Sequence, residues 1–472
     1  MSNLYHQIAA EIISQIDAGA YHIGDKLPGV RSASEIHEVS ASTIVAAYDE
    51  LLDGGYIEAR PRSGFYVRAR AQVDFLSPKM SQPSMIPRDV VGQQLMLPLL
   101  KQTQNPGTVN LGAAVLDVSL LPTAMVEKAI VKMARLERSN ICRYQFPPGN
   151  LALRQQIVKR MAHLGCELNV DDIVITNGCQ EALLLAIKAV TQPGDAVAVE
   201  SPTYYGMLQI IEHLGLKAIE IPTDPQTGIS LDALQLAFEN WPIKACLVMP
   251  NFSNPLGTTM SDANKKKLTV LCKKAKVHLI EDDIYGDLCF GAQRPSVCKR
   301  FDDKVIYCSS FSKTLAPGLR IGWMASRQLA ETVSQLKFMS NTGLPGIVQY
   351  ALVDILASGK YDRHLRSLRT KLAKSTHEMI TAIERYFPAN TCLTQPKGGF
   401  ILWAELPPEI MKNKDTFALA LTALEKKIAI TPGKLFSANQ KYTHCLRLSS
   451  GGFWSPEKEK ALKAVGELIK LL

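Results

Sequence analysis

Six short strand-like runs, separated by stretches with helical spacing, dominate the middle of this 472-residue chain. Their alternation predicts an α/β fold, in which a mostly parallel sheet has helices on both faces. In an open sheet of this kind, ligands bind at the carboxyl ends of the strands. The residues after each run are therefore the first place to look for a site. The expected strands are residues 173–176, 196–199, 245–248, 278–281, 305–308 and 320–323.

The composition is that of an ordinary globular protein, with 46% hydrophobic and 21% charged residues. Its length predicts two or three domains. No apolar run approaches the roughly 20 residues that a membrane span needs, and the first residues lack the pattern of a signal peptide. Ten cysteines are scattered without a C-x-x-C pair. This spacing argues against structural zinc and a disulfide scaffold, so we expect no metal and a cytoplasmic location.

Lys313 lies between the last two runs, where a side chain is expected near the interior. Because burying an ammonium group is costly, such a lysine is usually deprotonated, paired or covalently used. Ser310 and Ser312 precede it and Arg320 follows seven residues later, which suits a phosphate-bearing aldehyde on the amine. A surface lysine beside a strand is the alternative for this stretch taken alone.

The ends of the other runs carry further candidate residues. Residues 177–183 begin a helix whose free N–H groups can hold a phosphate. An aromatic residue, Tyr204, follows the second run, and an Asn254-Pro255 turn follows the third. Consecutive acids at residues 281–283 end a buried strand and need a cationic partner. Taken singly, a tight turn, a packing aromatic residue or a common Asn-Pro turn explains most of these features.

In this order, the segments resemble the fold-type-I pyridoxal-phosphate enzymes of the aspartate aminotransferase superfamily, over nearly all of residues 108–472. The resemblance implies pyridoxal 5′-phosphate, carried as an aldimine on Lys313. Tyr204 would stack on the ring, and Asn254 and Tyr285 would hydrogen-bond its phenolate oxygen. The Asp-x-x-Tyr spacing selects Asp282, rather than Asp283, for the pyridinium nitrogen, which makes the ring an electron sink. The implied phosphate ligands are Gly178, Cys179, Gln180, Ser310, Ser312 and Arg320.

Three further segments extend the resemblance. Residues 143–149 resemble the segment whose tyrosine, here Tyr144, reaches the phosphate of a neighbouring subunit, which implies a dimer. Residues 397–400 resemble the glycine pair that starts a strand of the family's small domain. Arg447 stands where the family binds a substrate α-carboxylate, although an ordinary surface salt-bridge arginine is the alternative.

Residues 1–70 predict a second, smaller module. Apolar residues recur every four positions from Leu4 to Ile16, a second helix is expected at about 31–38, and Ser40 can cap a third. Two short strands at 56–59 and 65–68 flank an arginine-bearing tip. Three helices and a basic wing predict a winged helix-turn-helix, whose third helix fits a major groove.

This module resembles the GntR-type DNA-binding domain. The third helix is poor in charge, with Ala41 and Ala46 where the family often has basic residues, and residues 1–70 carry a net charge of −3 in a chain of +9. A dimerisation module or a winged helix that has lost DNA binding is the alternative. The residues expected near DNA are Arg31, Ser32, Ser40, Ser42, Thr43, Arg60 and Arg62.

We expect a DNA-binding head at 1–70, a proline-bearing linker at 71–107 and an aminotransferase-like domain at 108–472. The large part of that domain is expected at about 145–345, and the small part at 108–144 and 346–472. This order resembles the MocR-type subfamily of GntR regulators. It implies a head-to-tail homodimer that binds double-stranded DNA and senses an amine, an amino acid or the cofactor itself. A working aminotransferase with a vestigial head is the rival hypothesis, and a scaffold protein is a weaker third.

Overall fold

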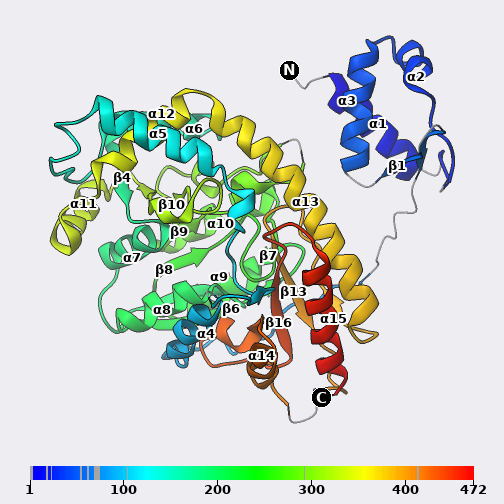
Figure 1. Cartoon of the computed structure of the whole chain (residues 1–472). Helices are drawn as coiled ribbons and strands as arrows, with labels where there is room; N and C mark the ends of the chain where they lie inside the picture. The colour runs from blue at the N-terminus through cyan, green and yellow to red at the C-terminus, as the bar shows by residue number, and fades with distance from the viewer. Residues whose placement is uncertain are drawn as a thin grey trace. The chain divides into compact units, whose positions relative to one another are not determined.

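The structure is a computed structural model of the chain (Figure 1). The residues that it describes are 4–17, 20–22, 24–53, 56–60, 63–67, 75–103, 105–291, 293–411 and 414–471. The chain divides into two compact units, residues 1–74 with 373–381 and residues 75–372 with 382–472. No helix in the described part of the chain is long and apolar enough to cross a membrane.

The N-terminal unit has the three helices and the two-stranded wing that the sequence predicts. Ser40 caps the third helix, because its Oγ accepts the Thr43 N–H at 3.3 Å. The side chains of Ile44, Tyr48 and Leu51 on that helix are buried in the core of the unit. The elements are α1 (Leu4–Asp17), α2 (Val30–Ile36), α3 (Ala41–Asp53), β1 (Ile57–Arg60) and β2 (Gly64–Val67), the strands being antiparallel.

An eight-stranded sheet in the order β4-β11-β10-β9-β8-β5-β6-β7 forms the centre of the second unit. Neighbouring strands from β10 to β6 are parallel, whereas β11 is antiparallel to both β10 and β4. The strands are β4 (Ile173–Thr176), β5 (Ala196–Ser201), β6 (Lys217–Asp224), β7 (Gly228–Ile229), β8 (Ile243–Val248), β9 (His278–Asp282), β10 (Ile306–Ser310) and β11 (Gly322–Ala325).

Two details of this sheet differ from the sequence expectation. The last predicted strand begins at Gly322 and not at residue 320, because Arg320 adopts a left-handed conformation with φ of 53° after a short 3₁₀ turn. Strand β6 was not predicted at all. On its outer side, β6 pairs only with the two-residue strand β7, and Pro222 falls within β6. The sequence of β6 therefore gives a weaker strand signal.

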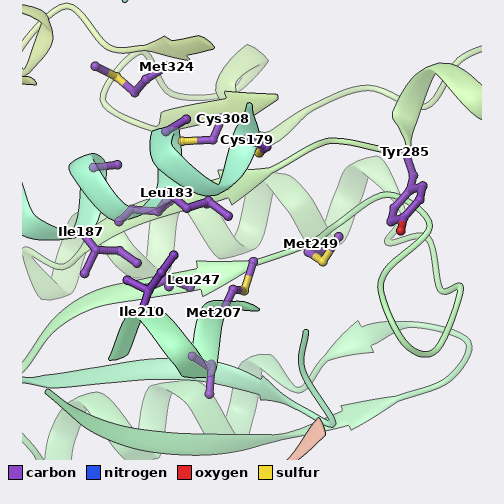
Figure 2. Close-up of a cluster of buried hydrophobic side chains, with 14 of the residues drawn as sticks. Cys179, Leu183, Ile187, Met207, Ile210, Leu247, Met249, Tyr285, Cys308 and Met324 are labelled. Carbon is purple, nitrogen blue, oxygen red and sulfur yellow. The ribbon is translucent and has the colours of Figure 1, made fainter. Parts of the chain in front are cut away.

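Helices cover both faces of the sheet because successive strand residues point to opposite sides. Leu247 and Met324 pack against α7 (Cys179–Val190) and α8 (Tyr205–His213), as Figure 2 shows. Val174 belongs to the same hydrophobic cluster. The residues between them pack on the other face, against α6, α12, α9 and α10. The other helices that pack around this sheet are α5 (Thr123–Leu136), α6 (Leu151–His163), α9 (Leu231–Asn240), α10 (Asp262–Ala275), α11 (Ala330–Asn341) and α12 (Gly346–Ala357).

The small part is built on a four-stranded antiparallel sheet in the order β12-β13-β16-β15. A separate two-stranded parallel ladder joins β14 (Ile428–Ala429) to β3 (Val109–Asn110), so residues 109–112 lie beside 427–431. The elements are β12 (Cys392–Leu393), β13 (Ile401–Glu405), β15 (Thr431–Pro432), β16 (Cys445–Ser449), α13 (Lys360–Tyr386), α14 (Thr416–Glu425) and α15 (Pro456–Lys470). Residues 373–381 of α13 are those grouped with the first unit in the division above.

Residues 75–91, here called the strap, run along the second unit. The Leu76 carbonyl accepts the Leu393 N–H of β12 at 3.1 Å, and Arg88 forms a bridge with Ala218 of β6. The strap thus contacts both the small sheet and the large sheet. It is followed by α4 (Met96–Gln102). The domain and linker boundaries given above stay a prediction.

Candidate functional site

The site forms where β9, β10 and the parallel strands beside them end. Asp282 is the last residue of β9 and Ser310 the last residue of β10. Because β11 is antiparallel to β10, it starts at the edge where β10 ends, and this brings Arg320 to the same edge. Because β11 runs in the opposite direction, one edge of the sheet holds residues that follow β9 and β10 together with residues that precede β11.

Lys313 follows β10 and is half-buried. Its Nζ donates to the Ala114 carbonyl at 2.5 Å. Burial, together with the positive charge of Arg447, lowers the pKa of Lys313 to about 8, although Asp282 acts in the opposite direction. The lysine is therefore easier to deprotonate than an ordinary one, which is what a nucleophilic amine needs.

The two neighbouring aspartates have different surroundings. Asp283 forms an ion pair with Arg294 and accepts hydrogen bonds from Tyr307 Oη at 2.7 Å and Asn251 Nδ2 at 2.9 Å. Asp282 accepts only from Cys179 Sγ at 3.4 Å and the Ile284 N–H at 3.2 Å, and forms no ion pair with any described residue. Burial raises the pKa of Asp282 to about 7. Asp282, and not Asp283, is thus available to a cationic ring nitrogen.

Arg447 lies on β16 and is completely buried, which excludes the surface salt-bridge alternative. Its Nε and Nη2 donate to the Gly112 carbonyl at 3.1 and 2.6 Å, and its Nη1 donates to Asn254 Oδ1 at 3.2 Å. It forms no ion pair in the described parts of the chain. A buried guanidinium without a counter-ion is unfavourable, so an anionic ligand fits beside it. Asn254 in turn hydrogen-bonds the side chain of Tyr285, whose pKa burial raises above its ordinary range.

A cradle suited to phosphate lies at the start of α7. Gly178 has a φ of +79°, and a Cβ added to it would lie 2.4 Å from Arg320 Nη2. A Cβ on Gly322 would lie 2.5 Å from the Gly178 carbonyl carbon, so both glycines are needed for this close packing. Ser312 Oγ is buried without a hydrogen-bond partner among the described residues, and Ser310 Oγ accepts the Ser312 N–H at 3.2 Å. Helix N–H groups, a guanidinium and an unpartnered hydroxyl together fit a phosphate group.

Tyr204 immediately precedes α8, and a Cβ on Gly206 would lie 2.4 Å from its ring. Burial raises the pKa of Tyr204 well above its ordinary value. Gln180 Nε2 donates to the Gly206 carbonyl at 2.8 Å, so this side chain ties α7 to the start of α8. The backbone N–H of Gln180, at the start of α7, is free of this contact and suits a phosphate. The side chain of Cys179 contacts Asp282, which the sequence does not reveal.

Tyr144 is not brought to this site within the chain. Its side chain is 76% exposed and stacks on Phe146 with the ring centroids 5.4 Å apart. Ala114 and Gly112, in contrast, contact Lys313 and Arg447 although no motif marks them. The only sequence signal for them is the short strand at residues 109–110, which is too brief to recognise in advance.

In the N-terminal unit, Ser40 Oγ lies 2.8 Å from both Ser42 Oγ and Thr43 Oγ1 at the start of α3. Arg31 and Ser32 are exposed on α2. Arg60 is exposed on the wing, where it stacks on Tyr66 at 4.3 Å and donates to Glu58 Oε1 at 2.8 Å. Arg62 lies outside the described residues.

Comparison with known proteins identifies both units. Residues 107–465 match the family model for aminotransferase class I and II, and residues 4–67 match that for the gntR family of bacterial regulatory proteins. The HTH-type transcriptional regulator YdcR of Escherichia coli strain K12 is 39% identical over 99% of both chains. The chain belongs to the MocR-like transcriptional regulators. The HTH-type regulator YisV of Bacillus subtilis strain 168 is 26% identical over 99% of this MocR-like chain and 96% of its own.

Solved structures resemble the aminotransferase-like unit of this MocR-like regulator. The multiple substrate aminotransferase of Thermococcus profundus is 26% identical with a TM-score of 0.73, covering 81% of this chain and 97% of its own. LysN, an α-aminoadipate aminotransferase of Thermus thermophilus complexed with N-(5′-phosphopyridoxyl)-L-leucine, is 25% identical with a TM-score of 0.72, covering 80% and 97%. The predicted fold class and the pyridoxal phosphate cofactor are confirmed, and the unpartnered groups around Lys313 fit that cofactor.

Proposed function

We propose that this MocR-like regulator binds double-stranded DNA through its N-terminal unit and senses a small amine or amino acid at the Lys313 site. One observation carries the proposal. The chain has a GntR-type unit, and its other unit brings together the amine of Lys313, the buried carboxylate of Asp282 and the buried guanidinium of Arg447. Among the described residues, this guanidinium forms no ion pair. An amino acid carries an amine, which could replace Lys313 on the cofactor, and a carboxylate, which Arg447 could bind.

Pyridoxal phosphate, when bound, supplies an aldehyde that condenses with amines and a ring that withdraws electrons. Lys313 Nζ would hold the cofactor covalently and give way to an incoming amine. The Asp282 carboxylate would keep the proton on the ring nitrogen, while Asn254 Nδ2 and Tyr285 Oη would donate to the phenolate oxygen. Tyr204 would stack on the ring. The backbone N–H groups of residues 178–180 would bind the phosphate with Ser310, Ser312 and Arg320.

The strap gives the effector a physical route to the DNA-binding unit. Arg447 belongs to the small sheet, and Lys313 follows a strand of the large sheet. An effector that binds both side chains would therefore change how the two sheets sit against each other. Because the strap contacts β12 at Leu76 and β6 at Arg88, this change would strain it and act on the chain that leads to the head. Effector and DNA affinities would then be linked reciprocally.

A homodimer, arranged head to tail, is part of the proposal. Tyr144, Phe146, Phe338 and Met339, here called the aromatic patch, are more than half exposed, and Phe146 lies 5.9 Å from Phe338 between ring centroids. Contiguous exposed apolar side chains favour a protein interface. From this patch Tyr144 would reach the phosphate bound by the second subunit. An apolar cavity of about 390 Å³ also opens beside Leu315 and Ala316, close to Lys313, where the second subunit would cover it.

Footprinting on the DNA upstream of the protein's own gene tests the regulator function. We expect two protected half-sites, whose affinity changes when the effector amino acid is added to the cofactor-loaded protein. Absence of specific protection at low salt would contradict DNA recognition. Loss of the effector response, but not of DNA binding, is expected in Lys313→Ala. Lys304, an exposed lysine that precedes β10, offers the control variant Lys304→Ala.

The rival hypothesis, a working aminotransferase, predicts a different result. It requires rapid conversion of the cofactor to its amine form by an amino acid and turnover with a 2-oxo acid, independent of DNA. The regulator names of the two-domain relatives do not favour it. A regulator is expected to bind its effector without sustained turnover, and steady-state assays with an amino-acid panel distinguish the two.

A further inference from the structure

Three strands of the small sheet bring sulfur and carboxylate side chains into one row. Cys392 of β12 lies opposite Glu405 of β13, and Glu405 lies opposite Cys445 of β16. Residues that face each other across antiparallel strands project on the same side of the sheet, with Cβ atoms about 4.5–5.5 Å apart. His444 directly precedes Cys445, and its carbonyl accepts the Leu406 N–H at 3.0 Å.

The donor atoms of this cluster are close together. One ligand atom each from Glu405, His444 and Cys445 lies within 4.8 Å of the other two. In a tetrahedral zinc site with ligand bonds of about 2.0–2.3 Å, donors lie roughly 3.3–3.8 Å apart. Side-chain movements of about 1 Å would therefore bring the three donors to one ion. Cys392, which lies opposite Glu405 on β12, can supply a fourth donor.

The chemistry of the donors selects the class of ion. Thiolate and imidazole ligands suit zinc and similar borderline divalent cations, whereas calcium and magnesium prefer oxygen ligands. The carboxylate of Glu405 accepts hydrogen bonds from the Trp403 side chain and from the backbone N–H of Lys79 in the strap. Such partners orient a metal ligand before the ion arrives. Cys445 is buried, while Glu405 and His444 are half-buried, so the cluster is open to entry from solvent.

We propose that Glu405, His444 and Cys445, completed by Cys392, bind a zinc-like divalent cation. The site is separate from the Lys313 site and does not depend on the proposed effector. An ion there would join β12, β13 and β16 at the point where the strap contacts Glu405. The absence of a C-x-x-C pair does not exclude it, because sheet register and not local spacing assembles the ligands.

Cobalt titration of the full-length, cofactor-loaded protein, stripped first with a chelator, tests the proposal. We expect one Co²⁺ per chain, with visible d–d bands of a tetrahedral ion and a thiolate charge-transfer band, both displaced by Zn²⁺. Difference spectra against the metal-free protein remove the absorbance of the cofactor. Zn²⁺ is also expected to raise the melting temperature, since it binds the folded chain.

Variants identify the ligands. His444 is half-buried and does not belong to the buried core, so His444→Asn is expected to fold normally. It should weaken Co²⁺ binding by more than about 100-fold, since losing even an orienting partner costs 10–100-fold. Glu405→Gln and Cys392→Ala are expected to weaken it as well, and Cys392→Ala should reduce the thiolate band. Cys142 is exposed and distant in sequence, so Cys142→Ser is the control and should change nothing.

Two results would overturn the site. One is a spectrum without a thiolate band, together with binding that His444→Asn leaves unchanged. The other is binding that Cys142→Ser abolishes, because the exposed thiol would then be the ligand. Cys445→Ser alters the core and is interpreted only when its unfolding transition matches that of the unaltered protein.

Discussion

At the scale of single residues, the surroundings of a side chain decide whether it is free to bind a ligand, and its residue type does not. Asp282 and Asp283 are adjacent and both buried, yet Asp283 has Arg294 as its counter-ion while Asp282 faces Cys179. The Asp-x-x-Tyr spacing selects Asp282, and the geometry leaves the same residue available. The charge of an unpaired buried acid must be removed by protonation or by a ligand.

The stability of the cofactor-free protein should depend on the state of Asp282. Because its folded-state pKa is about 7 and an ordinary aspartate titrates near 3.8, the folded protein holds this proton more tightly than the unfolded chain. Stability should therefore fall as pH rises from about 4 to 7, by at most about 4 kcal/mol for this group. Denaturant unfolding at several pH values measures it. Asp282→Asn should reduce this dependence of the unfolding free energy on pH. An unchanged dependence would contradict a raised pKa of Asp282 in the folded protein.

Gly178 should be required for the cofactor and not merely for the turn. Gly178→Ala places a Cβ against Arg320, and the positive φ adds strain of about 1–3 kcal/mol. Gly194 also has a positive φ but open space around it, so Gly194→Ala controls for strain alone. We expect Gly178→Ala to weaken pyridoxal phosphate binding by at least tenfold in fluorescence titrations, and Gly194→Ala to leave it unchanged. Equal effects of the two variants would argue against the phosphate cradle.

At the scale of elements, single strands decide which side chains meet. Arg447 lies opposite Trp403 and Thr431 across the small sheet, and its guanidinium reaches Gly112, which the ladder of β3 with β14 holds in place. The sequence suggests Arg447 from a resemblance, but it does not reveal that the side chain is buried without a carboxylate. That result depends on the packing of β16.

Arg447→Met should separate effector binding from cofactor binding. Removing a buried charge that binds a carboxylate costs roughly 2–5 kcal/mol, so the affinity for the effector amino acid should fall by about 30-fold or more. The cofactor spectrum should remain, because Lys313 is unchanged. Spectral titration with an amino-acid panel measures both. Arg300, on a short 3₁₀ turn away from the site, offers the control Arg300→Met. If Arg447→Met kept its affinity for the effector amino acid, Arg447 would not be the residue that binds the effector carboxylate.

The low charge of α3 gives a second prediction at this scale. Ala41 is exposed at the start of this helix, so Ala41→Arg adds a cation next to Ser40 and Ser42. We expect tighter non-specific DNA binding and a salt slope steeper by about 1. Arg31→Ala should change the slope by the same amount in the opposite direction. Lys101→Ala in the other unit is the control, and equal slopes in all variants would place DNA away from these helices.

At the scale of the whole molecule, we predict that a second copy of the chain completes the site. Tyr144 is expected to bind a phosphate, yet it is exposed on the aromatic patch and makes no contact with Ser310, Ser312 or Arg320. We therefore expect this tyrosine to act across an interface, on the phosphate bound by the second subunit. The effector response would then report on both subunits together.

Disrupting the aromatic patch should produce monomers with a weakened cofactor site. Met339→Glu places a charge among the exposed apolar side chains, where desolvation disfavours it on association. Val270 on α10 is similarly exposed, and Val270→Glu is the matched control. We expect sedimentation to show a dimer for the control and a monomer for Met339→Glu, with reduced cofactor affinity in the monomer. A dimer in both variants would place the interface elsewhere.

The sequence alone predicted the two modules and the sheet with its helices, because these follow from local periodicity and short motifs. The cofactor residues at the strand ends came from the resemblance and stay a prediction. Strand β6, the antiparallel direction of β11 and the start of β11 at Gly322 required the structure, since pairing partners are distant in the chain. Among the described residues, tertiary packing also left Asp282 and Arg447 without an ion pair and Ser312 Oγ without a hydrogen bond. It also brought together Cys392, Glu405, His444 and Cys445, whose sequence spacing carries no signal. Register between strands, and not proximity along the chain, decides such contacts.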